Sequence, residues 1–266
     1  MGRLALVTGA SAGIGAAFAR VYARAGFDLA LSARREERLE ALADELRKAH
    51  GVRAMTIAAD LARPGAVDVI LGELRSAGAS VDVLVNNAGY GLPGTWRSTT
   101  WEAQAAALQV MLTAPLELSH KLLPEMVERR WGRILNIASL AGFAPGGRGH
   151  TTYAAIKSAL IKFSQSLHAE LEGGGVHCTA VCPGLTYSEF HDVNGTRERV
   201  KLAPARFWQT AEEVAEAGYY ASEHNRAVVV TGAANKLLAG LAKITPDPLA
   251  MEITKSLQAK YRGNAD

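Results

Sequence analysis

The sequence contains few of the residues on which stapled or metal-bound scaffolds depend. Its 266 residues include only two cysteines, Cys178 and Cys182. On a strand they would share one face but lie about 13 Å apart, which is too far for a disulfide. With no C-x-x-C pair and no paired histidines, the sequence excludes a disulfide framework and predicts no metal site. We expect both thiols to be buried as small apolar groups in a reducing compartment.

The sequence also has little excess of either charge and no long apolar run. The 29 basic and 26 acidic residues leave a formal net charge of +3, which is too weak to indicate a nucleic-acid partner. No run approaches the roughly 18 uncharged apolar residues of a membrane span, so no transmembrane segment is predicted. The first residues lead directly into Leu4–Val7 without a signal core, and we expect a cytoplasmic protein.

Short aliphatic runs alternate with longer amphipathic stretches along most of the chain. The expected strands are Leu4–Val7, Asp28–Ser32, Ala54–Ala58, Val81–Val85, Arg133–Ala138, Val176–Cys182 and Ala227–Val230. The expected helices are Ala16–Ala25, Glu36–Ala49, Ala66–Ala77, Trp101–Arg130 and Ala154–Glu172. This alternation predicts an α/β fold in which a parallel sheet of about seven strands carries helices on both faces. The carboxyl ends of the strands then meet at one edge, where ligands bind.

No Pro/Gly/Ser-rich linker or internal repeat divides the chain, so residues 1–266 are predicted to form a single domain. Residues 185–209 are the longest irregular stretch, which in a compact domain is typical of a substrate-binding loop. Residues 235–266 form an amphipathic C-terminal tail. We expect its apolar run Lys236–Lys243 to pack over the substrate cleft or on a partner subunit, with a membrane surface as the alternative.

A glycine-rich turn follows the first expected strand. Residues 8–15 read T-G-A-S-A-G-I-G and lead into a helix. Backbone amides at a helix N-terminus, uncrowded by Cβ atoms, form a binding site for pyrophosphate. The spacing G-x-x-x-G-x-G differs from the general dinucleotide fingerprint G-x-G-x-x-G, so a simple tight turn between strand and helix is an equal alternative.

The second expected strand lacks the acidic residue that usually holds the ribose 2′-hydroxyl of NAD(H). It leads instead into Ala33-Arg34-Arg35. A guanidinium pairs with a 2′-phosphate through charge-assisted hydrogen bonds, so Arg34 favours NADP(H) over NAD(H). The alternative is that both arginines belong to the first turn of a solvated helix.

Five motifs occur in order along the chain. They are the turn Thr8–Gly15, the run Asn86-Asn87-Ala88-Gly89, Ser139, the pair Tyr153-x-x-x-Lys157, and Pro183-Gly184. Together they resemble the single-domain short-chain dehydrogenase/reductase family, strongly over residues 1 to about 190 and more loosely to about 232. The resemblance implies a Rossmann-like doubly wound sheet, a nicotinamide cofactor, and hydride transfer between that cofactor and a carbonyl or alcohol carbon. It also implies a homo-oligomer, a dimer or tetramer, for which the long helices Trp101–Arg130 and Ala154–Glu172 offer faces.

The expected cofactor contacts come from the glycine turn, from the arginines, and from positions that match the family motifs. They are Gly9, Ser11, Gly13, Ile14, Gly15, Arg34, Asp60, Leu61, Asn87, Ala88, Gly89, Tyr153, Lys157, Pro183, Gly184, Thr186 and Ser188. Asp60 and Leu61 resemble the family's contact with the adenine edge, although Asp60 is also suited to capping a turn.

The predicted catalytic residues are Ser139, Tyr153 and Lys157. Tyr153 and Lys157 are four residues apart at the start of a helix and therefore share one face. A free phenol has a pKa of about 10, which a neighbouring ammonium and an oxidised nicotinamide would lower. Tyr153 then donates a proton in reduction and accepts one in oxidation, and Ser139 hydrogen-bonds the substrate oxygen. The resemblance gives Lys157 a second task, which is to hold the nicotinamide ribose.

One position departs from the family pattern. In the family this helix usually carries an Asn, which holds a water that relays protons to the active-site Lys. In the helix Trp101–Arg130 of this sequence the residue at that position is Met111. A thioether cannot hold water by a strong hydrogen bond. We expect the three catalytic residues to suffice, with protons exchanged through solvent or a backbone carbonyl. The alternative is a cofactor-binding regulatory or scaffold protein with weak or lost turnover.

The substrate is the least specified feature. Aromatic and apolar residues on the loops that follow strands, and in the segment 185–209, favour a moderately hydrophobic carbonyl or alcohol compound. The candidate lining residues are Tyr90, Leu92, Trp96, Phe143, His150, Tyr187, Phe190, His191 and Trp208.

Overall fold

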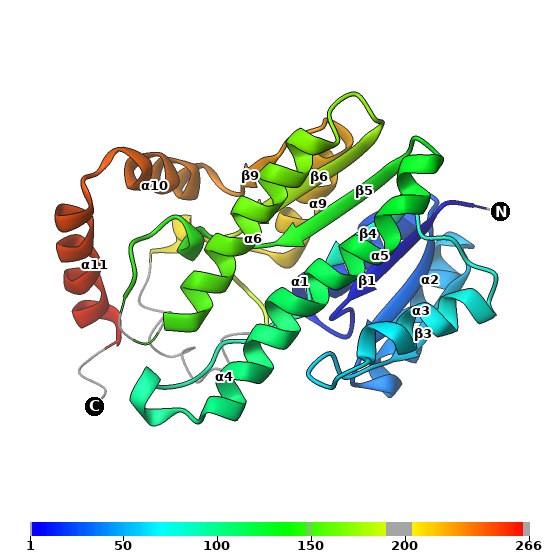
Figure 1. Ribbon diagram of the computed structural model, residues 1–266, viewed down its shortest axis with the longest axis horizontal. Helices are drawn as coiled ribbons and strands as arrows, with labels where there is room; N and C mark the ends of the chain where they lie inside the picture. The colour runs from blue at the N-terminus through cyan, green and yellow to red at the C-terminus, as the bar shows by residue number, and fades with distance from the viewer. Residues whose placement is uncertain (1, 148, 150, 190–203, 263–266) are drawn as a thin grey trace.

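The computed structural model describes residues 2–147, 149, 151–189 and 204–262. Seven parallel strands form one sheet in the order β3-β2-β1-β4-β5-β6-β9 (Figure 1). These strands are β1 (Leu4–Thr8), β2 (Asp28–Ala33), β3 (Ala54–Ala58), β4 (Val83–Asn86), β5 (Gly132–Ile137), β6 (Val176–Cys182) and β9 (Val228–Val230). The predicted doubly wound parallel sheet is therefore confirmed. A separate parallel pair joins β7 (Leu185–Thr186) to β8 (Trp208–Gln209).

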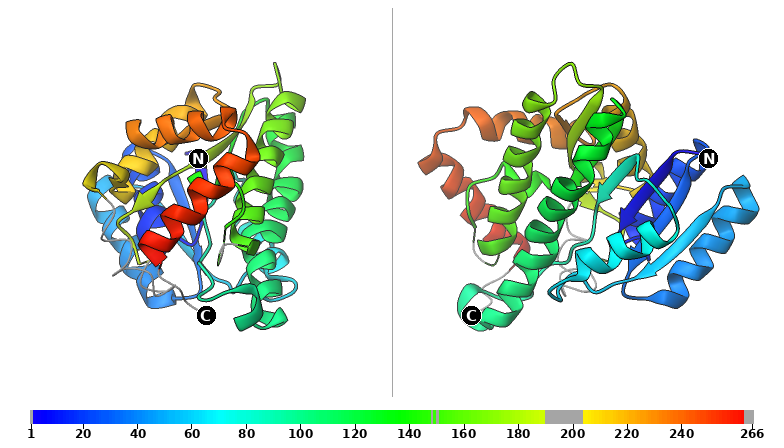
Figure 2. Two further views of the ribbon diagram at one scale, coloured as in Figure 1. Left: turned by 90° about the vertical axis from the view of Figure 1, so that its left-hand side faces the viewer. Right: turned by 45° about the vertical axis from the view of Figure 1, so that its right-hand side comes forward.

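Helices cover both faces of the sheet (Figures 1 and 2). One face carries α1 (Gly13–Arg24), α2 (Glu36–His50) and α9 (Ala211–Glu223), and the other carries α3 (Ala66–Ser76), α5 (Ala114–Glu128) and α6 (Thr151–Glu170). Successive side chains of a strand point to opposite faces. Leu4 and Leu6 of β1 therefore enter the core under α3, α5 and α6, while Ala5 and Val7 enter the core under α1, α2 and α9.

The predicted helix Trp101–Arg130 is interrupted. It consists of α4 (Trp101–Leu108), a π-helical turn (Gln109–Thr113) and α5. In a continuous α-helix the carbonyl of Met111 would accept from the N–H of residue 115, but Pro115 has no N–H and its ring crowds that carbonyl. The π turn, in which the Ala114 N–H donates to the Gln109 carbonyl, accommodates this mismatch.

The C-terminal tail forms two helices, α10 (Ala233–Ile244) and α11 (Asp247–Arg262), at the opposite end of the molecule from β3 (Figure 1). Asn235 and Ala239 on the inner side of α10 are buried. Leu237 and Ile244 on its outer side are 66% and 77% exposed, so this helix presents an apolar face to solvent. Residues 263–266 of the predicted tail lie outside the described residues.

Both cysteines are buried and unbridged, as the sequence predicts. Within the described part of the chain, no helix is long and apolar enough to cross a membrane. The same residues contain no cluster of histidine, cysteine and acidic side chains that could hold a metal ion.

Candidate active site

A cleft of about 600 Å³ opens at the carboxyl ends of the strands. Its centre lies beside β1 and β4, the point at which the strand order changes direction, and ligands bind there in open α/β sheets. Every predicted cofactor-binding or catalytic residue lines this cleft, with the exception of Gly15. The predicted residues in its lining are Gly9, Ser11, Gly13, Ile14, Arg34, Asp60, Leu61, Asn87, Ala88, Gly89, Ser139, Tyr153, Lys157, Pro183, Gly184, Thr186 and Ser188.

The glycine turn leaves its backbone open to the cleft. Gly9 has a φ of +66°, and a Cβ there would lie 2.8 Å from the Cα of Ala88. A Cβ on Gly15 would lie 2.3 Å from the carbonyl oxygen of Gly9, so Gly15 allows α1 to pack against the turn from behind. Asn87 holds the turn through its Nδ2, which donates to the carbonyl oxygens of Thr8 at 2.9 Å and Gly9 at 3.2 Å. Gly15 and the side chain of Asn87 thus shape the cradle.

The two arginines that follow β2 both line the cleft. Arg35 donates from Nε and Nη2 to Ser11 Oγ at 3.2 and 3.0 Å, and from Nη1 to Glu189 at 2.8 Å. The sequence selected Arg34 as the specific contact, and the neighbouring Arg35 is the one that reaches Ser11 and Glu189. Nothing in the sequence indicated Glu189, which is 154 positions from Arg35.

Asp60 lies where the adenine end of a dinucleotide was expected. Its Oδ1 accepts a hydrogen bond from the Ala62 N–H at 3.1 Å, so it caps the turn after β3. The same residue lines the cleft, and the two interpretations of Asp60 are therefore compatible.

Ser139, Tyr153 and Lys157 meet at the cleft beside the end of β5. Ser139 precedes the short helix η3 (Leu140–Gly142), and its Oγ accepts from the Ala141 N–H at 3.1 Å. Tyr153 shares a side-chain hydrogen bond with Ser139. Lys157 is only 5% exposed, and its Nζ donates to the carbonyl of Ile137 at 2.7 Å. The Nζ lies 5.6 Å from the centre of the Tyr153 ring.

Burial shifts the pKa values of Tyr153 and Lys157, the two titratable members of the predicted catalytic set. Desolvation lowers the pKa of Lys157 to about 8. Desolvation raises the pKa of Tyr153, and the hydrogen bond with Ser139 opposes this only in part. The predicted lowering of the Tyr153 pKa depends on the Lys157 ammonium together with an oxidised nicotinamide. The protein groups alone do not produce it, because burial outweighs the hydrogen bond with Ser139 and the Lys157 ammonium donates to the Ile137 carbonyl. At neutral pH Tyr153 keeps its proton, as a proton donor must.

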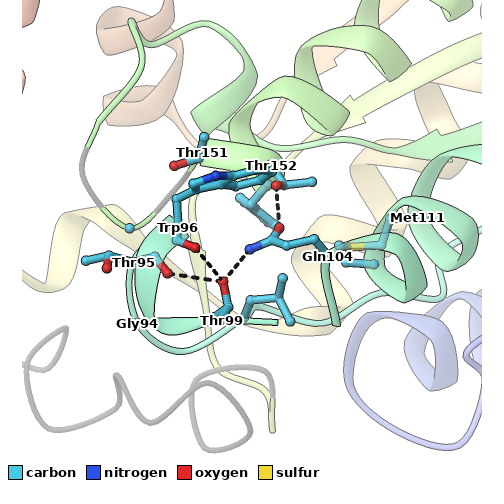
Figure 3. A pocket seen from close by; sticks show the side chains of 12 residues that line it. Gly94, Thr95, Trp96, Thr99, Gln104, Met111, Thr151 and Thr152 are labelled. Carbon is cyan, nitrogen blue, oxygen red and sulfur yellow. Dashed lines mark hydrogen bonds between the residues drawn. The ribbon is translucent and has the colours of Figure 1, made fainter. Parts of the chain in front are cut away.

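Met111 occupies the position at which the family pattern has Asn. Its side chain is buried, and a Cβ on Gly89 would lie 3.2 Å from its Sδ. The thioether thus packs against the glycine that ends the motif Asn86–Gly89. It also lines a smaller cavity, together with Gln104 and Ala107 of α4 and residues 151–153 at the start of α6 (Figure 3).

Gln104 crosses this smaller cavity and joins α4 to the first turn of α6 (Figure 3). Its Nε2 donates to Thr99 Oγ1 at 2.7 Å, and its Oε1 accepts from the hydroxyl of Thr152. Thr152 immediately precedes Tyr153. Gln104 is 6% exposed, so its hydrogen bonds are shielded from bulk water. They hold the backbone next to Tyr153 in place. The sequence offered no signal for Gln104.

The predicted substrate-lining residues separate into four groups. Tyr90 lines the main cleft, while Leu92 and Trp96 line the smaller cavity. Phe143, Tyr187 and Trp208 are not among the described residues that line either space, and the rings of Tyr187 and Trp208 stack on each other with centres 4.6 Å apart. His150, Phe190 and His191 lie outside the described residues.

The family model for short chain dehydrogenases matches residues 3–198 of the sequence. The chain belongs to the short-chain dehydrogenase family. This short-chain dehydrogenase is 38% identical to nodulation protein G of Rhizobium sp. strain N33, over 91% of this chain and 98% of that protein. It is 31% identical to the ketoacyl reductase HetN of Nostoc sp. strain PCC 7120, over 92% and 86% of the two chains.

A solved structure of a short-chain dehydrogenase from Sphingobium yanoikuyae in complex with NADPH is similar in both sequence and fold. The TM-score is 0.79 and the identity 34%, with 86% of this chain and 87% of that chain covered. Membership of this family places the chain among oxidoreductases.

Proposed function

We propose that the protein is an NADP(H)-dependent oxidoreductase that reduces the carbonyl group of a moderately hydrophobic compound. The observation that carries the proposal is the arrangement of Ser139, Tyr153 and Lys157 in the same cleft as the glycine turn. Two relatives support it, since one is solved with NADPH and another is named a ketoacyl reductase.

The residues of the cleft fit NADP(H). The turn at Gly9 has no room for a side chain and leaves backbone amides for the pyrophosphate. Arg34 and Arg35 supply guanidinium groups at the end of β2, where an NAD(H) site would carry an acid. These arginines would bind the 2′-phosphate, and Lys157 would hold the nicotinamide ribose. When bound, NADPH supplies the hydride that reduces the carbonyl carbon.

Three side chains then act on the carbonyl oxygen or on its proton. Ser139 and Tyr153 hydrogen-bond the oxygen and so hold the substrate in place. As negative charge develops on that oxygen, Tyr153 transfers its phenolic proton to it. Lys157, whose pKa of about 8 lies near neutrality, exchanges a proton with solvent or with the tyrosine and restores the phenol.

A second function, a cofactor-binding regulatory protein with weak or lost turnover, is favoured by one observation. Met111 fills the space beside Gly89 with a thioether, where the family pattern has an amide. The intact catalytic residues argue for the enzyme.

A panel of carbonyl compounds tests both functions, with loss of NADPH absorbance as the measurement of turnover. We expect turnover that Tyr153→Phe reduces by about 10²- to 10⁴-fold, the usual contribution of a positioned acid, while NADPH still binds. Binding of NADPH by the wild-type protein, with no turnover of any compound above the level of Tyr153→Phe, would contradict the enzyme function and support the regulatory one.

We further propose that residues 1–266 act as one catalytic domain, since a single sheet runs from β1 to β9. A homo-oligomer formed through α5 and α6, and a cytoplasmic location, stay predictions of the sequence.

A further inference from the structure

Three charged side chains meet at the end of the cleft that follows β2. Arg35 lies immediately before α2, and Arg38 lies in the first turn of that helix. Arg35 Nη1 and Arg38 Nη1 lie 2.8 and 2.6 Å from the two carboxylate oxygens of Glu189. One carboxylate thus bridges two guanidinium groups, in the position where the proposed cofactor would carry its 2′-phosphate.

The backbone before Glu189 is held across the glycine turn. β7 pairs with β8, and the N–H of Tyr187 donates to the Gln209 carbonyl at 2.9 Å. A Cβ on Gly13 would lie 3.0 Å from the Cβ of Ser188, so the chain passes directly over the turn. Glu189, the next residue, is thereby carried to the N-terminus of α2.

The surroundings of Glu189 keep it ionised. Hydrogen bonds from Arg35 and Arg38 lower its pKa below the usual value for a glutamate. A helix N-terminus also favours a negative charge. Because the two ion pairs are about half exposed to solvent, the carboxylate is held weakly and can be displaced.

We propose that Glu189 is an internal competitor of the cofactor 2′-phosphate and sets the preference of this protein between NADP(H) and NAD(H). This inference rests on the proposed function. The Glu189 carboxylate occupies the Nη1 group of Arg35, which a 2′-phosphate would otherwise bind, and is held there by Arg38. If it stays in place beside the phosphate, two like charges repel each other. In either case a nucleotide with a 2′-phosphate binds less tightly, whereas a nucleotide without that phosphate is unaffected.

Glu189→Gln tests the competition, because it removes the charge and keeps the shape. Isothermal titration calorimetry at low ionic strength, where surface charges act most strongly, compares 2′,5′-ADP with 5′-AMP. These probes differ only in the 2′-phosphate, and their binding requires no turnover. We expect the variant to bind 2′,5′-ADP about three- to tenfold more tightly than the wild type does, and 5′-AMP equally well, a change in the range of a displaced surface ion pair.

Glu45→Gln is the matched control. Glu45 pairs with Arg20 at 2.7 Å, and its side chain is about as exposed as that of Glu189. Neither Glu45 nor Arg20 is among the described residues that line the cleft. We expect this variant to bind both nucleotides as the wild type does.

The possible results separate the inference from the proposed function. If the wild type prefers 2′,5′-ADP but Glu189→Gln binds it equally or more weakly, the competition is overturned and NADP(H) dependence stands. Equal tightening of both nucleotides also overturns the competition, since the effect would not depend on the 2′-phosphate. If neither protein distinguishes the two nucleotides, both the inference and the NADP(H) assignment are wrong.

Discussion

Lys157 is a buried cation, so its charge lowers the stability of the folded protein in a pH-dependent way. Its pKa falls from 10.5 to about 8 because burial removes the ammonium from water. Between these two values the unfolded chain binds a proton that the folded protein has lost. The free energy of unfolding attributable to this group therefore rises with pH from about 8 to 10.5 and is lowest below that range.

The size of the effect follows from the difference in pKa. A change from 10.5 to about 8, at about 1.4 kcal/mol for each tenfold change, corresponds to a penalty of about 3 kcal/mol at low pH. Between pH 7 and pH 10 most of this penalty, about 2 to 3 kcal/mol, disappears. Burial raises the pKa of Tyr153, and it raises that of Cys182 to about 12. Both groups are shared by the wild type and a Lys157 variant, so their contributions cancel when the two proteins are compared.

Lys157→Met isolates this contribution, since methionine fills the same space without a charge. Urea unfolding followed by circular dichroism at pH 7, 8.5 and 10 gives the free energy of unfolding of each protein. We expect the wild type to gain about 2 to 3 kcal/mol relative to the variant as the pH rises. Lys162→Met is the control, because it lies on the exposed side of the same helix and keeps Lys157. Relative to this variant, the wild type should show no such gain. A difference between wild type and Lys157→Met that is independent of pH would refute the burial of a charged lysine.

Two further substitutions test the packing around the cleft. Gly15→Ala places a Cβ 2.3 Å from the Gly9 carbonyl oxygen, and we expect it to lower the free energy of unfolding by about 1 to 3 kcal/mol, measured by urea unfolding; an unchanged value would show that the turn has room to move. Gln104→Leu removes the hydrogen bond to Thr152 beside Tyr153, and we expect kcat to fall about ten- to hundredfold while the KM for NADPH stays constant. A fall in kcat that is accompanied by a comparable loss in the free energy of unfolding would assign Gln104 a structural role only.

The agreement between sequence and structure is best where local pattern is sufficient. The strands Ala54–Ala58 and Val176–Cys182 were predicted with their observed limits, because each is a short, mainly apolar run that follows a glycine-containing turn. The long helix from Trp101 was predicted without its π turn. Its apolar periodicity continues through Pro115, and the consequence of a missing N–H depends on how the helix adjusts within the packed fold.

The sequence by itself determined the class of sheet and the positions of the glycine turn, the arginines after β2 and the three predicted catalytic residues, because each depends on residue type and spacing along a short stretch of chain. Tertiary structure alone brought Glu189 to Arg35 and Arg38, and Gln104 to Thr152. It also decided the direction of the Tyr153 pKa, since burial outweighs the hydrogen bond with Ser139. The physical reason is the same in these cases: contacts between distant segments and the loss of water around a charge arise only when the helices and loops pack against the sheet.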